Sequence, residues 1–177
     1  MAKPIGPICN LDCHYCYYLQ KEALYPGTSS WRMPAATLEA YIGQLIAAQP
    51  ANVPEITFAW QGGEPTLLGV EFFERVMQIQ QQLAPPRTRI VNALQTNGTL
   101  LDDRWAAFFR DQQFLIGLSI DGPAELHDGY RRDLRGGGTF ASVLKALQLL
   151  RRFEVEFNAL VVVHRQNGDH GRRVYTY

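Results

Sequence analysis

Four short apolar runs alternate along the chain with longer segments of helical periodicity. The runs are rich in Ile, Val, Phe and Leu, and they span residues 55–60, 89–96, 114–120 and 155–163. Near-continuous apolar runs of this length are typical of strands that are buried on both faces of a parallel sheet. The intervening segments repeat apolar residues every three or four positions, which predicts amphipathic helices over residues 35–49, 69–83, 101–112 and 139–153.

This alternation predicts a succession of βα units with right-handed crossovers. A short first strand at residues 3–5 would raise the number of strands to about five, and residues 165–177 would form a loop and the start of a further helix. Asp102 and Thr139 are the expected N-caps of the third and fourth helices. We therefore predict an α/β fold, a partial (β/α) barrel truncated after about five strands, as one domain over residues 1–177.

Composition and charge narrow the classes of function. Of the 177 residues, 46% are hydrophobic and 19% are charged, which suffices for one sizeable core. The formal net charge is zero, so no overall basic field would attract nucleic acid. No apolar run reaches the length of a signal peptide or a membrane span, and three cysteines are an odd count for a disulfide framework. We expect a cytoplasmic protein that binds neither nucleic acid nor membranes.

Polar and glycine-rich motifs follow the predicted strands. The sequences QGGEP (61–65), TNG (96–98) and SIDG (119–122) each end a strand, and a cysteine-containing loop follows the short first one. The carboxyl ends of parallel strands meet at one edge of the sheet, where the chemistry of such folds gathers. We therefore expect these loops to form one site.

All three cysteines, Cys9, Cys13 and Cys16, lie within eight positions of one another. A structural zinc site needs four ligands, usually as two separated pairs, and His14 directly follows Cys13 and would point away from a shared ion. A cubane [4Fe–4S] cluster is normally held by four thiolates, so three of them would leave one iron open to a cofactor or substrate. The C-x3-C-x2-C spacing favours the cluster, and a small structural zinc-binding module is the alternative.

This spacing, with the aromatic Tyr15 just before the third cysteine, resembles the signature of the radical S-adenosylmethionine (SAM) enzymes. The resemblance implies a [4Fe–4S] cluster on Cys9, Cys13 and Cys16, with SAM chelating the fourth iron. It further implies that a 5′-deoxyadenosyl radical abstracts hydrogen from the substrate, and that a donor such as flavodoxin or ferredoxin supplies the electron.

Other motifs resemble SAM-binding elements of the same family. The resemblance implies that GGEP (62–65) holds the SAM amino group, that Ser119 binds ribose or carboxylate with Asp121 as a lesser candidate, and that Arg131 pairs with the carboxylate. Taken alone, these motifs would be ordinary turns, and Arg131 or its neighbour Arg132 would be a solvated arginine.

Two sets of residues follow from the resemblance. The expected SAM-binding residues are Tyr15, Gly62, Gly63, Glu64, Ser119 and Arg131. The residues expected to face a substrate cavity are Tyr18, Gln61 and Asn97.

Together the motifs look most like those of the anaerobic sulfatase-maturating enzymes, from the first residues to about residue 164. This resemblance implies oxidation of a cysteine or serine in a sulfatase polypeptide to Cα-formylglycine. A radical SAM maturase of another peptide or cofactor precursor is the alternative. The family continues into a cysteine-rich domain with auxiliary clusters and a catalytic acid or base. We therefore expect this chain to be an incomplete radical SAM core, with the base beyond residue 177.

Overall fold

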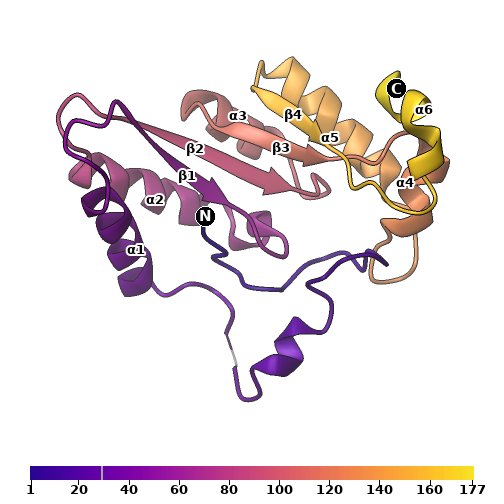
Figure 1. Ribbon diagram of the computed structural model, residues 1–177, viewed down its shortest axis with the longest axis horizontal. Helices are drawn as coiled ribbons and strands as arrows, with labels where there is room; N and C mark the ends of the chain where they lie inside the picture. Colours follow the sequence, from indigo (N-terminus) through magenta and orange to yellow (C-terminus); the bar gives the residue numbers. More distant parts are fainter. Residues whose placement is uncertain (29) are drawn as a thin grey trace.

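Within residues 1–28 and 30–177, which the computed structural model describes, four strands form a parallel sheet in the order β1-β2-β3-β4 (Figure 1). Each strand pairs with the next one along the chain, with Ile56 opposite Ile90 and Leu118 opposite Ala159. The strands are β1 (Glu55–Trp60), β2 (Arg89–Thr96), β3 (Leu115–Ser119) and β4 (Phe157–Leu160). The predicted α/β fold and its parallel sheet are confirmed.

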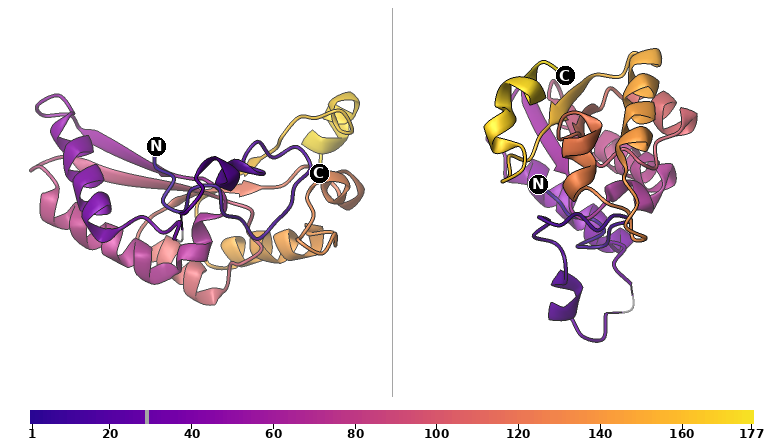
Figure 2. Two further views of the ribbon diagram at one scale, coloured as in Figure 1. Left: turned by 90° about the horizontal axis from the view of Figure 1, so that it is seen from below. Right: turned by 90° about the vertical axis from the view of Figure 1, so that its right-hand side faces the viewer.

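The predicted helices are also present, each beginning and ending within a residue or two of its expected bounds. They cover one face of the sheet (Figure 2, left). They are α1 (Ala35–Ala47), α2 (Val70–Leu83), α3 (Asp103–Asp111) and α5 (Phe140–Arg152). The shorter elements are η1 (Lys21–Leu24), η2 (Pro65–Leu68), α4 (Ala124–Tyr130), η3 (Gly168–His170) and α6 (Gly171–Tyr175). In the described part of the chain, no helix has the length and apolar character needed to cross a bilayer.

The core lies between this helical layer and the sheet, and aromatic side chains dominate it. Trp60 of β1, Phe73 of α2 and Phe109 of α3 are at most 1% exposed. The Phe73 ring meets the rings of Trp60 and Phe114 edge-on, at centroid distances of 5.9 and 6.2 Å. Each such buried side chain contributes roughly 1.5–3 kcal/mol. This packing holds the carboxyl ends of the strands in a fixed array.

The predicted first strand at residues 3–5 is wrong. Only Ala2 bridges to β1, in parallel with Trp60, and the residues after it form turns. Pro4 has no amide hydrogen to donate to a ladder, and Gly6 turns the chain with a φ of 58°. The chain therefore leaves the edge of β1 at once and runs past the carboxyl ends of the strands (Figure 1).

Both predicted N-cap positions are confirmed, but only one of the two side chains makes a capping hydrogen bond. The Asp102 side chain accepts a hydrogen bond from the Trp105 amide at 2.9 Å and caps α3 as expected. Thr139 has a helix-like ψ of −6°, and its hydroxyl makes no capping bond. Instead Asp128 accepts hydrogen bonds from the amides of Thr139 and Phe140, each at 2.8 Å. The start of α5 is thus capped by a residue of α4, eleven positions earlier.

Candidate functional site

One cavity of about 370 Å³, at the carboxyl ends of the strands, brings together the residues singled out in the sequence. The expected cluster, SAM and substrate residues line it, whereas the lesser candidate Asp121 does not: Cys9, Cys13, Cys16, Tyr15, Tyr18, Gln61, Gly62, Gly63, Glu64, Asn97, Ser119 and Arg131. Leu11, Tyr17, Gln95, Thr96 and Val162 complete the wall. The loops therefore form one site, as predicted, and the binding roles of the individual residues stay predictions.

The Gly62–Gly63 pair lets the cysteine loop pack directly on the end of β1. The Gly63 amide donates to the Gly6 carbonyl, and the Glu64 amide donates to the Ile8 carbonyl, both at 2.8 Å. A Cβ atom on Gly63 would lie 1.9 Å from the Ile8 carbonyl oxygen. The close neighbour that requires glycine here is the chain's own backbone just before Cys9.

The other side of the cysteine loop contacts the segment after α4. Asp12 donates its amide hydrogen to the Arg132 carbonyl at 2.8 Å, and His14 donates to the Tyr130 carbonyl at 3.0 Å. Leu11 forms an antiparallel bridge with Asp133. The loop that carries the cysteines is therefore held from both sides by backbone hydrogen bonds.

The thiols lie in a setting that suits bound thiolates. Burial raises the pKa of Cys13 to about 12 and also raises the pKa of Cys9, so both are thiols until a metal displaces the proton. The Leu11 amide and the Asn97 side-chain amide already donate to the Cys9 sulfur, at 3.4 and 3.7 Å. Such donors stabilise the sulfur of a metal-bound cysteine and tune the attached cluster.

The arrangement of the donors fits a cluster better than a single ion. Within residues 1–28 and 30–177, no three Cys, His, Asp or Glu side chains converge to hold one metal ion. Zinc would need every sulfur about 2.3 Å from the same centre. A cubane cluster spreads its thiolates over separate irons, and three cysteines around one cavity meet that need.

Glu64 is 1% exposed, and its carboxylate joins its own turn to the loop after β2. Oε1 accepts from the amide and hydroxyl of Thr66, at 3.0 and 2.6 Å, and from the Thr96 hydroxyl at 2.8 Å. Oε2 accepts from the Asn97 amide at 2.7 Å. Burial raises the pKa of Glu64, and these hydrogen bonds offset part of that rise. Only Oε2 keeps a lone pair for a ligand, since about two bonds fill each oxygen.

Arg131, and not its neighbour Arg132, faces the cavity. The Arg131 guanidinium binds Asp121 through Nε and Nη2, at 2.8 and 3.3 Å. Burial by itself would raise the pKa of Asp121, but the hydrogen bonds and charge of Arg131 outweigh it and the pKa is lowered. Arg132 instead donates to the Gly136 carbonyl within its own hairpin. Ser119 is buried at the end of β3, as the strand prediction requires.

Tyr18 and Asn97 both line the cavity, but they differ in whether their side-chain polar groups already have hydrogen-bond partners. The Tyr18 hydroxyl is buried and, in the described part of the chain, has no hydrogen-bond partner. The Asn97 amide is engaged: it donates to Asn10 at 2.9 Å and accepts from the amide and hydroxyl of Thr99. Asn97 therefore supports the loop around Cys9, although we expected it to meet the substrate.

His127 is a central residue of the site region that the sequence reasoning passed over. It is 0% exposed, its Nδ1 accepts from the Asp121 amide at 3.2 Å, and its Nε2 lies 3.1 Å from the Thr139 hydroxyl. That hydroxyl donates to the Arg131 carbonyl, so it must accept from Nε2–H. Burial, followed by the charge of Arg131, lowers the pKa of His127 to about 4. The neutral ring thus fastens α4 and α5 to the end of β3.

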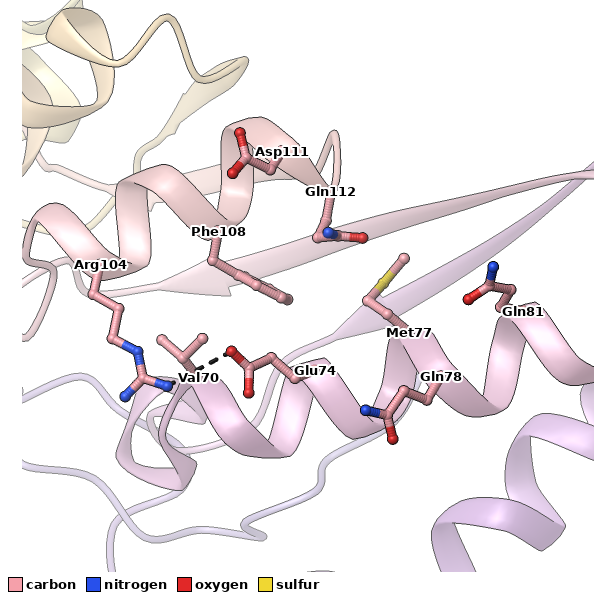
Figure 3. A pocket seen from close by; sticks show the side chains of 9 residues that line it. All are labelled: Val70, Glu74, Met77, Gln78, Gln81, Arg104, Phe108, Asp111 and Gln112. Carbon is pink, nitrogen blue, oxygen red and sulfur yellow. Dashed lines mark ion pairs between the residues drawn. The ribbon is translucent and has the colours of Figure 1, made fainter.

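A second hollow, of about 430 Å³, lies between α2 and α3 (Figure 3). Met77 and Phe108 form its apolar part, and an exposed ion pair of Arg104 with Glu74, at 3.6 Å, lies beside them. The hollow belongs to the helical layer and contains no cysteine or buried titratable side chain. Its residues offer no catalytic chemistry.

Comparison with known proteins identifies relatives of this arrangement. The family model described as "Radical SAM superfamily" matches residues 4–176. A "Serine-type anaerobic sulfatase-maturating enzyme" from Klebsiella aerogenes is 46% identical over 175 residues, covering 99% of this chain and 42% of the relative. A "Cysteine-type anaerobic sulfatase-maturating enzyme" from Clostridium perfringens is 41% identical over 177 residues, covering 100% of this chain and 47% of the relative.

The fold also matches a solved structure. "Native anSMEcpe with bound AdoMet and Cp18Cys peptide" superimposes with a TM-score of 0.87 and 42% sequence identity, covering 99% of this chain and 45% of that one. The chain thus spans less than half the length of the relatives named here.

Proposed function

The chain belongs to the radical SAM superfamily, and from this membership and the site geometry we propose that it carries the cluster- and SAM-binding core of an anaerobic sulfatase-maturating enzyme. The observation that carries the proposal is the single cavity whose wall contains the three cysteines, the Gly62–Glu64 turn, Ser119 and Arg131. A zinc module would have no use for the polar groups that share this cavity with the cysteines.

The cavity residues divide the ligand contacts among them. Cys9, Cys13 and Cys16 hold a [4Fe–4S] cluster, which when bound supplies the electron that cleaves SAM to an oxidant able to remove hydrogen from a substrate. In the described part of the chain no protein group donates to the carbonyls of Gly62 and Gly63, so these oxygens can accept from the SAM ammonium together with Glu64 Oε2.

Arg131, Ser119 and Tyr15, which line the same cavity, would make the remaining contacts to SAM. Arg131 still has the two N–H groups of Nη1 free for a carboxylate, since its bonds to Asp121 use Nε and Nη2. The Ser119 hydroxyl binds the ribose or the carboxylate, and the Tyr15 ring lines the same wall. These groups fix SAM by its charges and by an aromatic face.

The substrate is a peptide with a cysteine or serine that becomes Cα-formylglycine. The names of the relatives specify a serine type and a cysteine type, and one solved relative holds a peptide. Tyr18 and Gln61, which line the same cavity, are the residues that would contact it. A reduced flavodoxin or ferredoxin supplies the electron.

Oxidation of the peptide requires a base that removes a proton from the substrate. Glu64 is the one carboxylate that lines the cavity among the described residues, and it already accepts four hydrogen bonds. Its remaining Oε2 lone pair is assigned to the SAM ammonium, so in the described part of the chain no cavity carboxylate is free to deprotonate the substrate. We expect this chain to cleave SAM without completing the oxidation of a peptide.

The test is anaerobic reconstitution with iron and sulfide, followed by incubation with dithionite, SAM and a Cys-x-Pro-x-Arg peptide. We expect a filled cluster and formation of 5′-deoxyadenosine, both absent in the Cys13→Ala variant. A colourless protein that holds one zinc would refute the proposal. Formylglycine formed over many turnovers by this chain alone would refute the expected limit on peptide oxidation.

A further inference from the structure

The carboxylate of Asp121, two residues beyond β3, is fully buried and accepts four hydrogen bonds. Oδ2 accepts from the Tyr15 hydroxyl and from Arg131 Nε, the latter at 2.8 Å. Oδ1 accepts from Arg131 Nη2 at 3.3 Å and from the Val162 amide at 2.9 Å. A carboxylate has about four lone-pair sites, so none remains for a ligand. The earlier suggestion that Asp121 binds the ribose therefore fails.

Three separate segments supply these donors. Tyr15 lies in the cysteine loop, Arg131 directly follows α4, and Val162 follows β4. Tyr15 and Arg131 both line the cavity, whereas Asp121 does not. Asp121 thus lies behind the cavity wall and joins the side chains that form it.

For Arg131, the contact fixes the plane of the guanidinium. With Nε and Nη2 directed at Asp121, Nη1 is the edge left for the cavity. Both side chains are at most 8% exposed, so the pair has no competing water contacts of consequence. An anionic ligand would therefore meet one defined edge of a neutralised ion pair rather than a freely moving cation.

For Tyr15, the contact fixes the ring through its only polar group. The ring stacks on those of Tyr130 and His164, at centroid distances of 5.8 and 5.4 Å, and the Arg131 guanidinium lies 5.5 Å above it. The Tyr15 hydroxyl donates to Asp121 Oδ2. The free part of the ring is left to line the cavity.

We propose that Asp121 is a positioning residue that contacts no cofactor and orients both Tyr15 and Arg131 for SAM. The inference rests on the proposed function, because it concerns how tightly the same cavity holds SAM. An asparagine cannot replace the aspartate. Its single oxygen would face four donors, its NH₂ group would add a further donor, and the buried Arg131 charge would lose its partner.

The test uses the full 177-residue chain with its cluster reconstituted. Tyr15→Phe removes the hydrogen bond to Asp121 and keeps the ring, and Tyr130→Phe is the matched control, because in the described part of the chain its hydroxyl has no hydrogen-bond partner. Asp121→Asn and the Tyr15→Phe/Asp121→Asn double variant complete a cycle. For each protein, iron and sulfide content, the SAM dissociation constant by calorimetry, and the SAM-induced change in the EPR spectrum of the reduced cluster are measured.

We expect Tyr15→Phe to retain its iron and sulfide and to bind SAM about tenfold more weakly, the equivalent of one charge-assisted hydrogen bond. Tyr130→Phe should match wild type. The double variant should bind SAM no more weakly than Asp121→Asn alone, since both changes break the same connection.

Wild-type affinity in Tyr15→Phe, or additive effects in the double variant, would overturn the inference. If Asp121→Asn fails to fold, the Tyr15→Phe and Tyr130→Phe pair still decides. A wild-type chain with a full cluster and no affinity for SAM would overturn the proposed function and this inference together.

Discussion

Gly63→Ala tests whether glycine is needed in the Gly62–Gly63 turn for packing against the cysteine loop, independently of any contact with a ligand. The added Cβ would lie 1.9 Å from the Ile8 oxygen, 2.4 Å from the Ile8 carbonyl carbon and 2.6 Å from the Pro7 oxygen. All three atoms belong to the backbone, so no side-chain rotation relieves the contact. The two segments must separate by more than about 1 Å to reach normal packing distance.

The cost follows from the bonds that this separation breaks. The Gly63-to-Gly6 and Glu64-to-Ile8 hydrogen bonds, both 2.8 Å long, lie at the point of collision. Losing both, with the buried groups left unpaired, costs about 2–4 kcal/mol. For a chain of this size that corresponds to a fall of about 5–15 °C in Tm. Cys9, the next residue after Ile8, would move with the loop.

We therefore expect Gly63→Ala to lose iron and sulfide after reconstitution, before any effect on SAM binding can be measured. Gly43→Ala is the control, because Gly43 lies inside α1 and a Cβ there would meet only Leu83, at an ordinary 3.8 Å. Alanine at this position should stabilise the helix by roughly 0.5–1 kcal/mol. The assays are metal analysis and thermal melting. A Gly63→Ala protein with full iron content and wild-type Tm would refute the steric argument.

Three further predictions follow from the site. Changing any one of the three cysteines to alanine should abolish the cluster, because no spare thiol exists; full iron and sulfide in any variant would contradict this. Arg131→Lys cannot make both bonds to Asp121, so the calorimetric SAM affinity should fall about tenfold while the exposed Arg135→Lys leaves it unchanged. The pKa of His127 is lowered from 6.5 to about 4 in the folded chain. Between pH 4 and pH 6.5 the unfolded chain therefore binds more protons than the folded chain. The contribution of His127 to the free energy of unfolding is thus fully present above pH 6.5, and roughly 3 kcal/mol of it is lost as the pH falls towards 4. Urea unfolding at several pH values should show this loss, and His127→Asn should flatten it.

The regular elements could be predicted because their signals are local. A strand buried on both faces needs a continuous apolar run, and β2 occupies the predicted residues 89–96 without change. A helix that covers a sheet needs an apolar stripe, and α5 buries Val143, Ala146 and Leu150 in that pattern. The strand expected at residues 3–5 failed because pairing is not local: Pro4 and Gly6 turn the chain away after one bridge.

The functional site could be predicted from the sequence only in part. The spacing of the cysteines and the polar motifs after the strands indicated which residues would gather, and one cavity contains all of them except Asp121. The sequence could not indicate how those side chains are used. Glu64 and Asn97 looked like ligand contacts, but most of their polar atoms bind neighbouring loops.

The sequence by itself determined the order of strands and helices, the location of the thiols and the edge of the sheet where the motifs meet. These depend on apolar periodicity and on the direction of parallel strands, which neighbouring residues encode. The tertiary structure alone decided that Gly63 packs against Ile8, that Asp128 caps α5, and that Asp121 joins Tyr15 to Arg131. Each of these contacts joins different elements of the fold, and a buried polar group takes whichever partner the packed fold brings within hydrogen-bonding distance.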